Sequence, residues 1–102
     1  MFKYRHKFNA VRTVNDGISF SSKREASFYD NLKILKVAGE VLFFLRQVPF
    51  HLPGNVTYRL DFMIFYANGD IRMVDVKGFK TKEYIMKKKM VEVEYPIKIE
   101  EV

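Results

Sequence analysis

Four charged residues have the types and spacing of a hydrolytic site: Glu25, Asp61, Asp75 and Lys77. Asp75 and Lys77 are two positions apart in a predicted strand, so their side chains point to the same face. Two carboxylates held close together repel each other unless a cation lies between them, and Mg²⁺ with oxygen ligands suits that position. A lysine beside them could orient or help deprotonate an attacking water and stabilise negative charge on a phosphate. These are the groups that phosphodiester hydrolysis requires.

The position of Asp61 depends on the turn that joins its strand to the strand of Asp75. A two-residue loop, Asn68-Gly69, would pair Asp61 with Val76 and place it on the face opposite Asp75. A three-residue loop, Ala67-Asn68-Gly69, pairs Asp61 with Asp75 directly. The longer loop needs a left-handed residue at its third position, and a glycine stands there. We therefore predict the three-residue loop, with the two Cβ atoms roughly 5 Å apart.

The elements that must position these residues follow an arm or short strand, basic and aromatic, at residues 1–15. The first of them are a turn at Asn15-Asp16-Gly17, a short strand at Ile18–Phe20, and a helix from the Ser22–Glu25 capping box to about Ala38 with Gly39 as its cap. A largely buried strand at Glu40–Leu52 follows, and then a strand at Val56–Tyr66 with its return strand at Asp70–Lys77. The chain ends with a helix from Thr81 to about Val91 and a last edge strand at Val93–Ile99 that Pro96 interrupts. The main order is helix, three strands, helix, strand. It predicts an α/β (α+β) fold with a mixed central sheet flanked by helices.

Length and composition exclude several classes of protein. The chain has 102 residues, enough for one core but not for a catalytic domain with a separate recognition domain. We therefore expect a single domain over residues 1–102, with the arm at 1–15 and the core at 16–102. No apolar run approaches the roughly 20 residues of a membrane span, and the N-terminus does not resemble a signal peptide. The lack of cysteine excludes disulfides and a thiol nucleophile and fits the cytoplasm.

The positive charge is concentrated in two segments. Residues 1–24 and 77–90 each carry a net charge of +5, whereas residues 25–76 carry −1 and residues 91–102 carry −3. A polyanion such as DNA is therefore the first partner to consider, and a solvated lysine-rich surface is the plainer alternative. The residues expected to contact DNA are Lys3, Arg5, Lys7, Arg12, Lys23, Lys80, Lys82 and Lys87, and Lys88 is a candidate for reaching a phosphate at the site.

The candidate site residues also have plainer interpretations. Glu25 could serve only the capping box of its helix. Asp61 could pair with Arg59 or Lys77 on a solvated face. Asp75 and Lys77 could likewise form a surface pair with each other. Gln47, which could line the site, could simply be a polar residue that ends a strand.

This pattern of residues resembles the PD-(D/E)XK nuclease superfamily. Asp61, followed after 13 residues by Asp75-Val76-Lys77, is similar to its signature, and Glu25 stands on a helix where the superfamily carries its first acid. The other matching segments are Gly17 to Phe20, Gln47-Val48-Pro49-Phe50, Tyr58-Arg59-Leu60-Asp61-Phe62 and the Gly78 that follows Lys77. The chain departs from the literal motif because Leu60 replaces a proline and the second acid is aspartate. The resemblance covers residues 16–91 and is greatest to small phage and prophage members, similar in layout to transposon end-cleaving endonucleases and phage junction resolvases.

The resemblance implies a restriction-endonuclease-like core and a metal-dependent DNA endonuclease. Asp61, Asp75 and the backbone carbonyl of Val76 would bind Mg²⁺, for which Mn²⁺ would substitute. Lys77 would be the catalytic lysine, and Glu25 would complete the site directly or through water. The resemblance also implies a protein encoded by a phage or prophage, acting on duplex or branched DNA in a bacterial host, with a phage replication, recombination or packaging protein as a partner.

Cutting both strands of a duplex or a junction needs two sites, whereas one small core presents one. We therefore expect a homodimer, for which the ten Phe and six Tyr leave apolar surface. Two other functions remain open: a catalytically inactive DNA-binding or recruiting subunit with the same fold, and a small adaptor whose basic ends bind an acidic protein.

Overall fold

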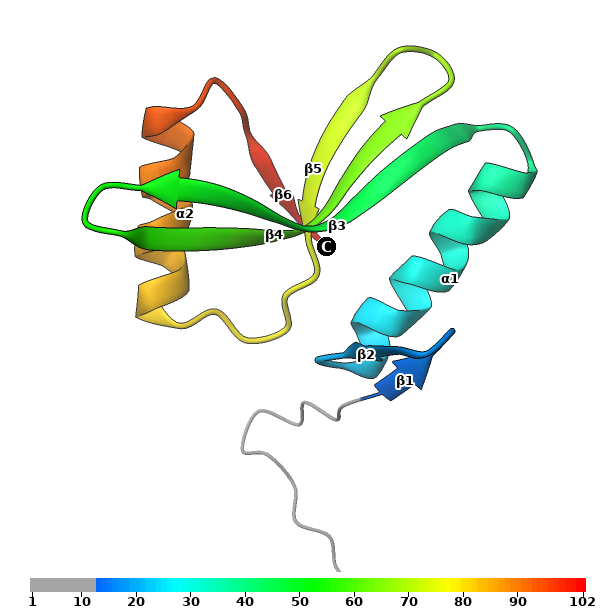
Figure 1. Cartoon of the computed structure of the whole chain (residues 1–102), viewed down its shortest axis with the longest axis horizontal. Coiled ribbons are helices and arrows are strands. Elements are labelled where there is room, and N and C mark those ends of the chain that lie inside the picture. The colour runs from blue at the N-terminus through cyan, green and yellow to red at the C-terminus, as the bar shows by residue number, and fades with distance from the viewer. Residues whose placement is uncertain (1–12) are drawn as a thin grey trace, which may run out of the picture.

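The computed structural model of the chain describes residues 13–102 and has an α+β fold (Figure 1). Its elements in chain order are β1 (Thr13–Asn15), β2 (Ile18–Phe20), α1 (Lys23–Val37), β3 (Val41–Leu52), β4 (Val56–Tyr66), β5 (Ile71–Asp75), α2 (Lys82–Glu94) and β6 (Ile99–Glu101). The predicted order of helix, three strands, helix and strand is confirmed, and the hairpin β1–β2 precedes it. The expected DNA contacts of Lys3, Arg5, Lys7 and Arg12 fall outside the described residues.

Four strands form one mixed sheet in the order β3-β4-β5-β6. β3, β4 and β5 are antiparallel neighbours, whereas β6 runs parallel to β5 at one edge. Figure 1 shows α1 beside one half of this twisted sheet and α2 beside the other. The predicted mixed sheet flanked by helices is therefore confirmed. Neither helix in the described part of the chain is long and apolar enough to cross a bilayer.

Each helix closes a separate apolar core. Phe62 of β4 packs in the core under α1 with Leu32, and Leu60 of the same strand packs in the core under α2 with Val91. The alternating apolar row of β4 therefore serves two cores, because the twist of a strand turns its two halves in different directions. Asp61 lies between these halves, where the two cores meet.

α1 begins and ends at the caps that the sequence predicts. The Ser22 hydroxyl accepts the Glu25 N–H at 3.1 Å, which is one half of the predicted capping box. The Glu25 carboxylate does not return to Ser22 but accepts the N–H and hydroxyl of Ser21. At the other end, Gly39 adopts a φ of +84°, and the next N–H donates to the Leu35 carbonyl at 3.0 Å. The helix thus ends where the glycine predicts.

β3 is an edge strand, and the prediction of a largely buried strand is wrong. Leu42, Phe43 and Leu45 are 58%, 44% and 46% exposed. A continuous apolar run is typical of a strand covered on both faces. Here the two helices cover only part of the sheet, so this end of β3 keeps exposed apolar side chains.

The last helix and strand have different bounds from those predicted. α2 continues to Glu94, because Val91 is fully buried and the Tyr95 N–H donates to its carbonyl at 2.8 Å. β6 begins only at Ile99, and Pro96 lies between helix and strand instead of within the strand. The alternating apolar residues of this segment imitate a strand period, which explains the error.

Candidate active site

The β4–β5 hairpin has the register that the three-residue loop requires. Phe62 is paired with Val74, and Gly69 has a left-handed φ of +96° in the loop. This register places Asp61 opposite Asp75, one residue beyond that pair. The prediction that the two aspartates face each other is confirmed.

The carboxylates of the two aspartates replace the backbone ladder where β4 and β5 separate. Asp75 Oδ1 accepts the Asp61 N–H at 2.9 Å, and Asp61 Oδ2 accepts the Val76 N–H at 2.9 Å. Beyond this point the segment from Asp75 to Lys77 pairs with the C-terminal residue instead of with β4. Val102 donates its N–H to the Asp75 carbonyl, and its carbonyl accepts the Lys77 N–H. β5 therefore ends at Asp75, two residues earlier than predicted.

Two tyrosines donate hydrogen bonds to the second carboxylate oxygen of Asp75. The Asp75 residue is only 1% exposed. The hydroxyls of Tyr58 and Tyr84 both donate to Asp75 Oδ2, the latter at 3.2 Å. Burial and, after it, the carboxylate of Asp75 raise the pKa of both tyrosines, so both remain donors. Sequence reasoning did not place either tyrosine at the site. No local signal marks them, because a tyrosine in an apolar row is ordinarily a core residue.

The side chain of Gln47 joins the carboxylates of Glu25 and Asp61. Its Nε2 lies 3.4 Å from Glu25 Oε2 and 3.4 Å from Asp61 Oδ1. Gln47 does not end a strand: it lies in the middle of β3 with a φ of +53°, which interrupts the extended backbone. Such a conformation in a non-glycine residue costs on the order of 1–3 kcal/mol and is typical of functional sites.

Glu25 is 2% exposed and faces the site from the first turn of α1. Its Oε1 accepts the Ser21 hydroxyl at 2.7 Å, and its Oε2 lies 3.9 Å from the Arg46 guanidinium. Arg46 also lies over the Phe20 ring at 4.5 Å, and its buried Nε has no hydrogen-bond partner among the described residues. Glu25 thus meets the site as well as the helix terminus. Arg46 is a site neighbour that no sequence pattern indicated.

The electrostatic environment of Asp61 favours its protonated form. Burial, followed by the negative charges of Asp75 and Glu25, raises the pKa of Asp61 to about 6. The Val76 N–H and the positive charge of Lys77 act in the opposite direction but do not compensate. A carboxylate in this position would be stabilised by any cation that reached it.

Lys77 lies on the same side of the sheet edge as Asp75, as alternation predicts. Its Nζ is 4.7 Å from the centre of the Tyr84 ring, whose hydroxyl donates to Asp75. Within residues 13–102, Asp61 forms no ion pair with Arg59 or Lys77. Neither plain surface interpretation therefore describes these residues, because Asp75 is buried and Asp61 contacts an amide and a backbone N–H.

The donor set fits a hard cation at Glu25 and Asp61 in part. In the described part of the chain, no three His, Cys, Asp or Glu side chains are arranged together as ligands. Mg²⁺ usually takes one or two carboxylates and keeps several waters, so two converging carboxylates suffice. The raised pKa of Asp61 and the amide between the two acids are consistent with a place for positive charge. Asp75 differs, because both its oxygens already accept hydrogen bonds from the protein.

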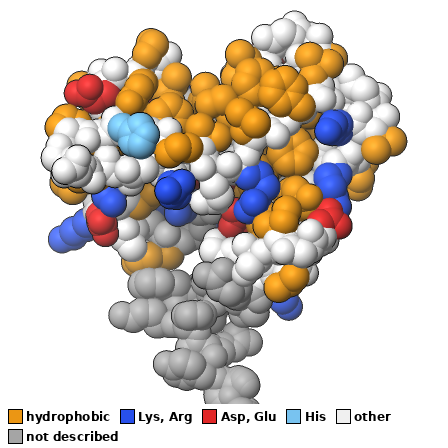
Figure 2. Space-filling view, viewed as in Figure 1, with side chains coloured by type: hydrophobic (Ala, Val, Ile, Leu, Met, Phe, Trp, Pro, Cys, Tyr) orange, Lys and Arg blue, Asp and Glu red, His pale blue; other side chains and the backbone are white. Residues whose placement is uncertain are grey.

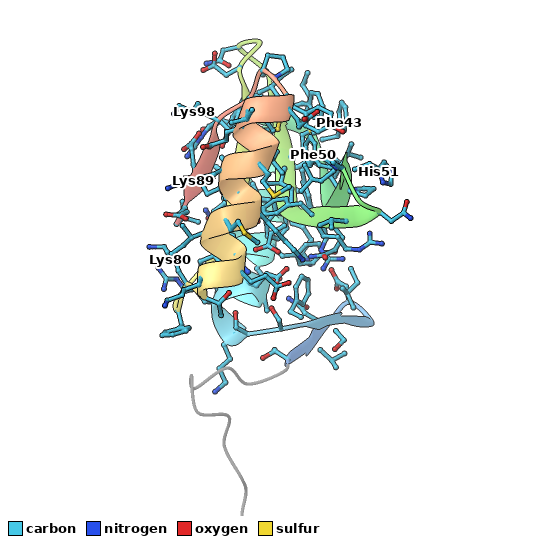
Figure 3. The ribbon with its side chains drawn as sticks, turned by 90° about the vertical axis from the view of Figure 1, so that its left-hand side faces the viewer. Phe43, Phe50, His51, Lys80, Lys89 and Lys98 are labelled. Atoms are coloured by element: carbon cyan, nitrogen blue, oxygen red, sulfur yellow. The ribbon has the colours of Figure 1, made fainter. Side chains whose placement is uncertain are left out.

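The lysines predicted to contact DNA lie in different environments. Lys80 and Lys88 pair with Glu101 at 3.5 and 3.7 Å, and Lys87 pairs with Glu83 at 3.0 Å. Lys23 and Lys82 are exposed. Figure 3 shows Lys80, Lys89 and Lys98 on one side of α2, and Phe43, Phe50 and His51 on the other.

Residues 5–100 match one family, described as "Protein of unknown function (DUF1064)". The chain belongs to this family. No curated protein and no solved structure matches it. The DUF1064 match includes both helices and the residues Glu25, Gln47, Asp61, Asp75 and Lys77, so the site is part of the region shared with the family.

Proposed function

We propose that the protein is a metal-dependent DNA endonuclease that hydrolyses phosphodiester bonds. The observation that carries the proposal is the convergence of Glu25, Asp61 and Asp75 from three different elements beside Lys77. The resemblance of the same residues to the PD-(D/E)XK signature supports it. We place this activity in phage or mobile-element DNA processing, in the cytoplasm of a bacterial host, by a phage- or prophage-encoded protein.

The residues of the chain divide the work of such a reaction. Glu25 and Asp61 would hold Mg²⁺ or Mn²⁺, and Asp75 and the Val76 carbonyl are the further ligands that the resemblance implies. The bound ion would act as a Lewis acid and lower the pKa of a bound water. Lys77 would stabilise the negative charge that develops on the phosphate, in a site where burial strengthens the interaction.

A cleavage assay tests the proposal. The full chain is incubated with supercoiled plasmid and with branched DNA, in Mg²⁺, Mn²⁺ or EDTA. We expect cleavage with either metal and none with EDTA. Lys77→Ala should lower the rate by about 100-fold or more, because it removes charge stabilisation at the phosphate. Lys89→Ala removes the same charge from the exposed part of α2 and should cut at the wild-type rate.

The second candidate function is a non-catalytic DNA-binding or recruiting subunit. It is favoured by one observation, that Tyr58, Tyr84 and the Asp61 N–H already engage both oxygens of Asp75. This candidate predicts salt-dependent DNA binding that is indifferent to Mg²⁺ and to Lys77→Ala. Absence of cleavage on every substrate, with Asp75→Ala indistinguishable from wild type, would reject the endonuclease.

We also propose that two copies associate, so that two sites act on one duplex or junction. The support is an apolar row, defined here as Phe43, Phe65 and Ile71, which lie side by side on β3, β4 and β5. The two phenylalanine rings stack at 4.3 Å, although Phe43 is 44% and Ile71 is 53% exposed. Figure 2 shows hydrophobic side chains gathered along the upper part of one face. Large exposed apolar patches of this kind mark interaction sites.

A further inference from the structure

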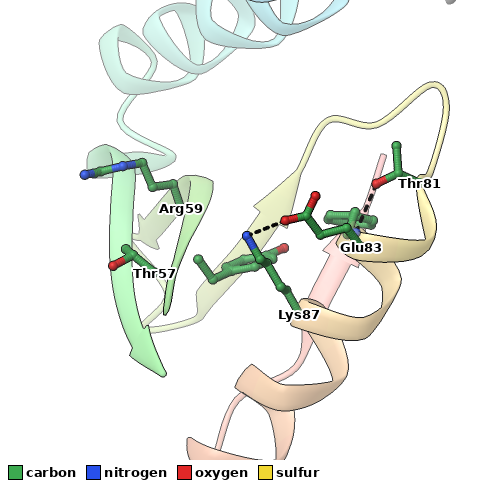
Figure 4. A pocket seen from close by; sticks show the side chains of 7 residues that line it. Thr57, Arg59, Thr81, Glu83 and Lys87 are labelled. Atoms are coloured by element: carbon green, nitrogen blue, oxygen red, sulfur yellow. Dashed lines mark hydrogen bonds and ion pairs between the residues drawn. The ribbon is translucent and has the colours of Figure 1, made fainter. Parts of the chain in front are cut away.

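A hollow of about 220 Å³ lies between the first half of β4 and the first turns of α2 (Figure 4). We call it the β4–α2 hollow, and its lining residues are Thr57, Tyr58, Arg59, Thr81, Glu83, Tyr84 and Lys87. The hollow is therefore large enough for a phosphate group with a few waters.

The hollow is joined to the candidate active site through its own lining. Tyr58 and Tyr84 line the hollow, and the same two hydroxyls donate to Asp75. The Tyr84 ring also carries the Lys77 ammonium. A group bound in the hollow is therefore separated from Asp75 and Lys77 only by the thickness of two tyrosine side chains.

The chemistry of the lining suits an anion with several oxygens. Arg59 is exposed, forms no ion pair with any residue in 13–102, and extends away from Lys87 (Figure 4), so its side chain must turn to reach an anion in the hollow. A guanidinium binds phosphate through two parallel hydrogen bonds. Lys87 adds a second positive charge from α2. Thr81 accepts the Tyr84 N–H at 3.0 Å through its hydroxyl oxygen, which leaves the hydroxyl proton to donate elsewhere.

Resting on the proposed nuclease function, we propose that the β4–α2 hollow binds a backbone phosphate of the nucleic acid strand, held by Arg59 and Lys87, next to the phosphate at Asp61 and Lys77. Lys87 is distinguished in this way from the other lysines of α2. Lys88 points its charge to Glu101, and Lys89 lines a different, apolar surface with Met86 and Val93.

Glu83 is the one acid of the hollow, and it pairs with Lys87 at 3.0 Å. The Glu83 side chain is 69% exposed, and a surface pair of this kind contributes about 0–1 kcal/mol. Lys87 can therefore exchange this carboxylate for a phosphate at little cost. A further consequence is that Glu83 opposes DNA binding, although it lies in the site.

Binding of a fluorescently labelled DNA duplex to the full chain, measured in EDTA as a function of salt, tests the proposal. Lys87→Ala and Arg59→Ala should each weaken binding about tenfold and lower the slope of log affinity against log salt by about 1. Lys89→Ala, which removes the same charge from the same helix, should change neither quantity by as much. Glu83→Gln should strengthen binding up to about fivefold, because it frees Lys87 and removes repulsion.

Equal losses of DNA affinity in Lys87→Ala and Lys89→Ala would overturn the proposal, and so would weaker DNA binding by Glu83→Gln. Circular dichroism checks that each variant is folded. In a parallel arm, inorganic phosphate competes with the duplex at constant ionic strength. If phosphate displaces the duplex at comparable concentration, the hollow is a site for a free anion and the proposal fails. The cleavage assay is independent. If the wild type cuts DNA but Lys87→Ala and Lys89→Ala bind DNA with equal affinity, the proposal for the hollow is rejected and the nuclease function stands. If Lys87→Ala and Arg59→Ala lose DNA binding selectively but the wild type cleaves no DNA, the nuclease function is rejected and the hollow stands as a DNA contact.

Discussion

The Asp61 carboxylate is retained in the fold at a cost in stability. Its pKa is about 6 in the folded protein against 3.8 for an ordinary aspartate. Well below pH 3.8 it is protonated in both the folded and the unfolded chain. Between about pH 4 and pH 6 the folded chain holds a proton that the unfolded chain has lost, so this contribution to stability falls as pH rises. At pH 7 the cost reaches at most about 3 kcal/mol.

Asp61→Asn should therefore raise the free energy of unfolding at pH 7 while abolishing cleavage. The amide oxygen can still accept the Val76 N–H, and the variant has no charge to bury. Urea unfolding between pH 4 and pH 8 measures the effect, and the gain over wild type should grow from pH 4 to pH 6 and then stay constant. The difference isolates Asp61, because the carboxyls with lowered pKa, Asp16, Glu100 and Glu101, are present in both proteins.

Mg²⁺ gives the same comparison a readout that does not depend on activity. The ion should raise the melting temperature of the wild type and have no such effect on Asp61→Asn, because only a binder of the folded state stabilises it. Asp30→Asn, an exposed acid of α1, serves as the matched control and should respond to Mg²⁺ as the wild type does. Equal responses of all three proteins would contradict metal binding at Asp61.

At the scale of the element, β3 is interrupted to serve the site. Regular pairing with β4 flanks Gln47 on both sides, at Arg46 with Phe62 and at Val48 with Leu60. The left-handed residue between these pairs brings one amide to two carboxylates. A strand with ordinary geometry at this point would lose that contact, so local strain and site geometry are coupled.

Replacing Gln47 separates the two roles. Gln47→Gly removes the strain of the left-handed backbone, whereas Gln47→Ala retains it, so the glycine variant should unfold with a free energy at least about 1 kcal/mol higher than the alanine variant. Both variants lose the amide, and both should cleave DNA more slowly than the wild type to the same extent. Urea unfolding and plasmid cleavage check the two parts. An alanine variant as stable as the glycine variant would contradict a left-handed residue at this position.

At the scale of the whole molecule, the two helices leave part of the sheet uncovered. The apolar row of Phe43, Phe65 and Ile71 lies on this part, together with Leu45, which is 46% exposed. Four such side chains expose on the order of 400 Å² of apolar surface, within the range of functional patches on small proteins. A standard interface buries about 800 Å² on each partner, so an interface centred here would also include the neighbouring edge of β3.

Phe43→Glu should convert a dimer to a monomer, because it places a charge in the centre of the apolar row. Val37→Glu introduces the same charge on α1, where Val37 is 91% exposed, and should leave the dimer intact. Light scattering over a range of protein concentrations measures the mass of each variant. A wild type that is monomeric at every concentration, or equal dissociation of both variants, would reject the dimer.

The sequence by itself determined the order of the elements and the juxtaposition of Asp61 and Asp75, but not the bounds of α2 and β6. These features depend on local chemistry: alternation along a strand, the cap at Ser22, and a left-handed glycine in a three-residue loop. A register once set by a turn extends along both strands, which is why a prediction made at Gly69 holds at the aspartates. Charge and spacing also marked Glu25 and Lys77 without any knowledge of their contacts.

Only the tertiary structure decided which further residues complete the site and which apolar residues remain exposed. Tyr58, Tyr84 and Arg46 meet the acids because the two helices cover different halves of a twisted sheet and the site lies where these halves join. The exposure of β3 depends in the same way on how far those helices extend over it. Contacts between residues so distant in the chain follow from the path of the whole backbone. No period or short motif in the sequence encodes that path.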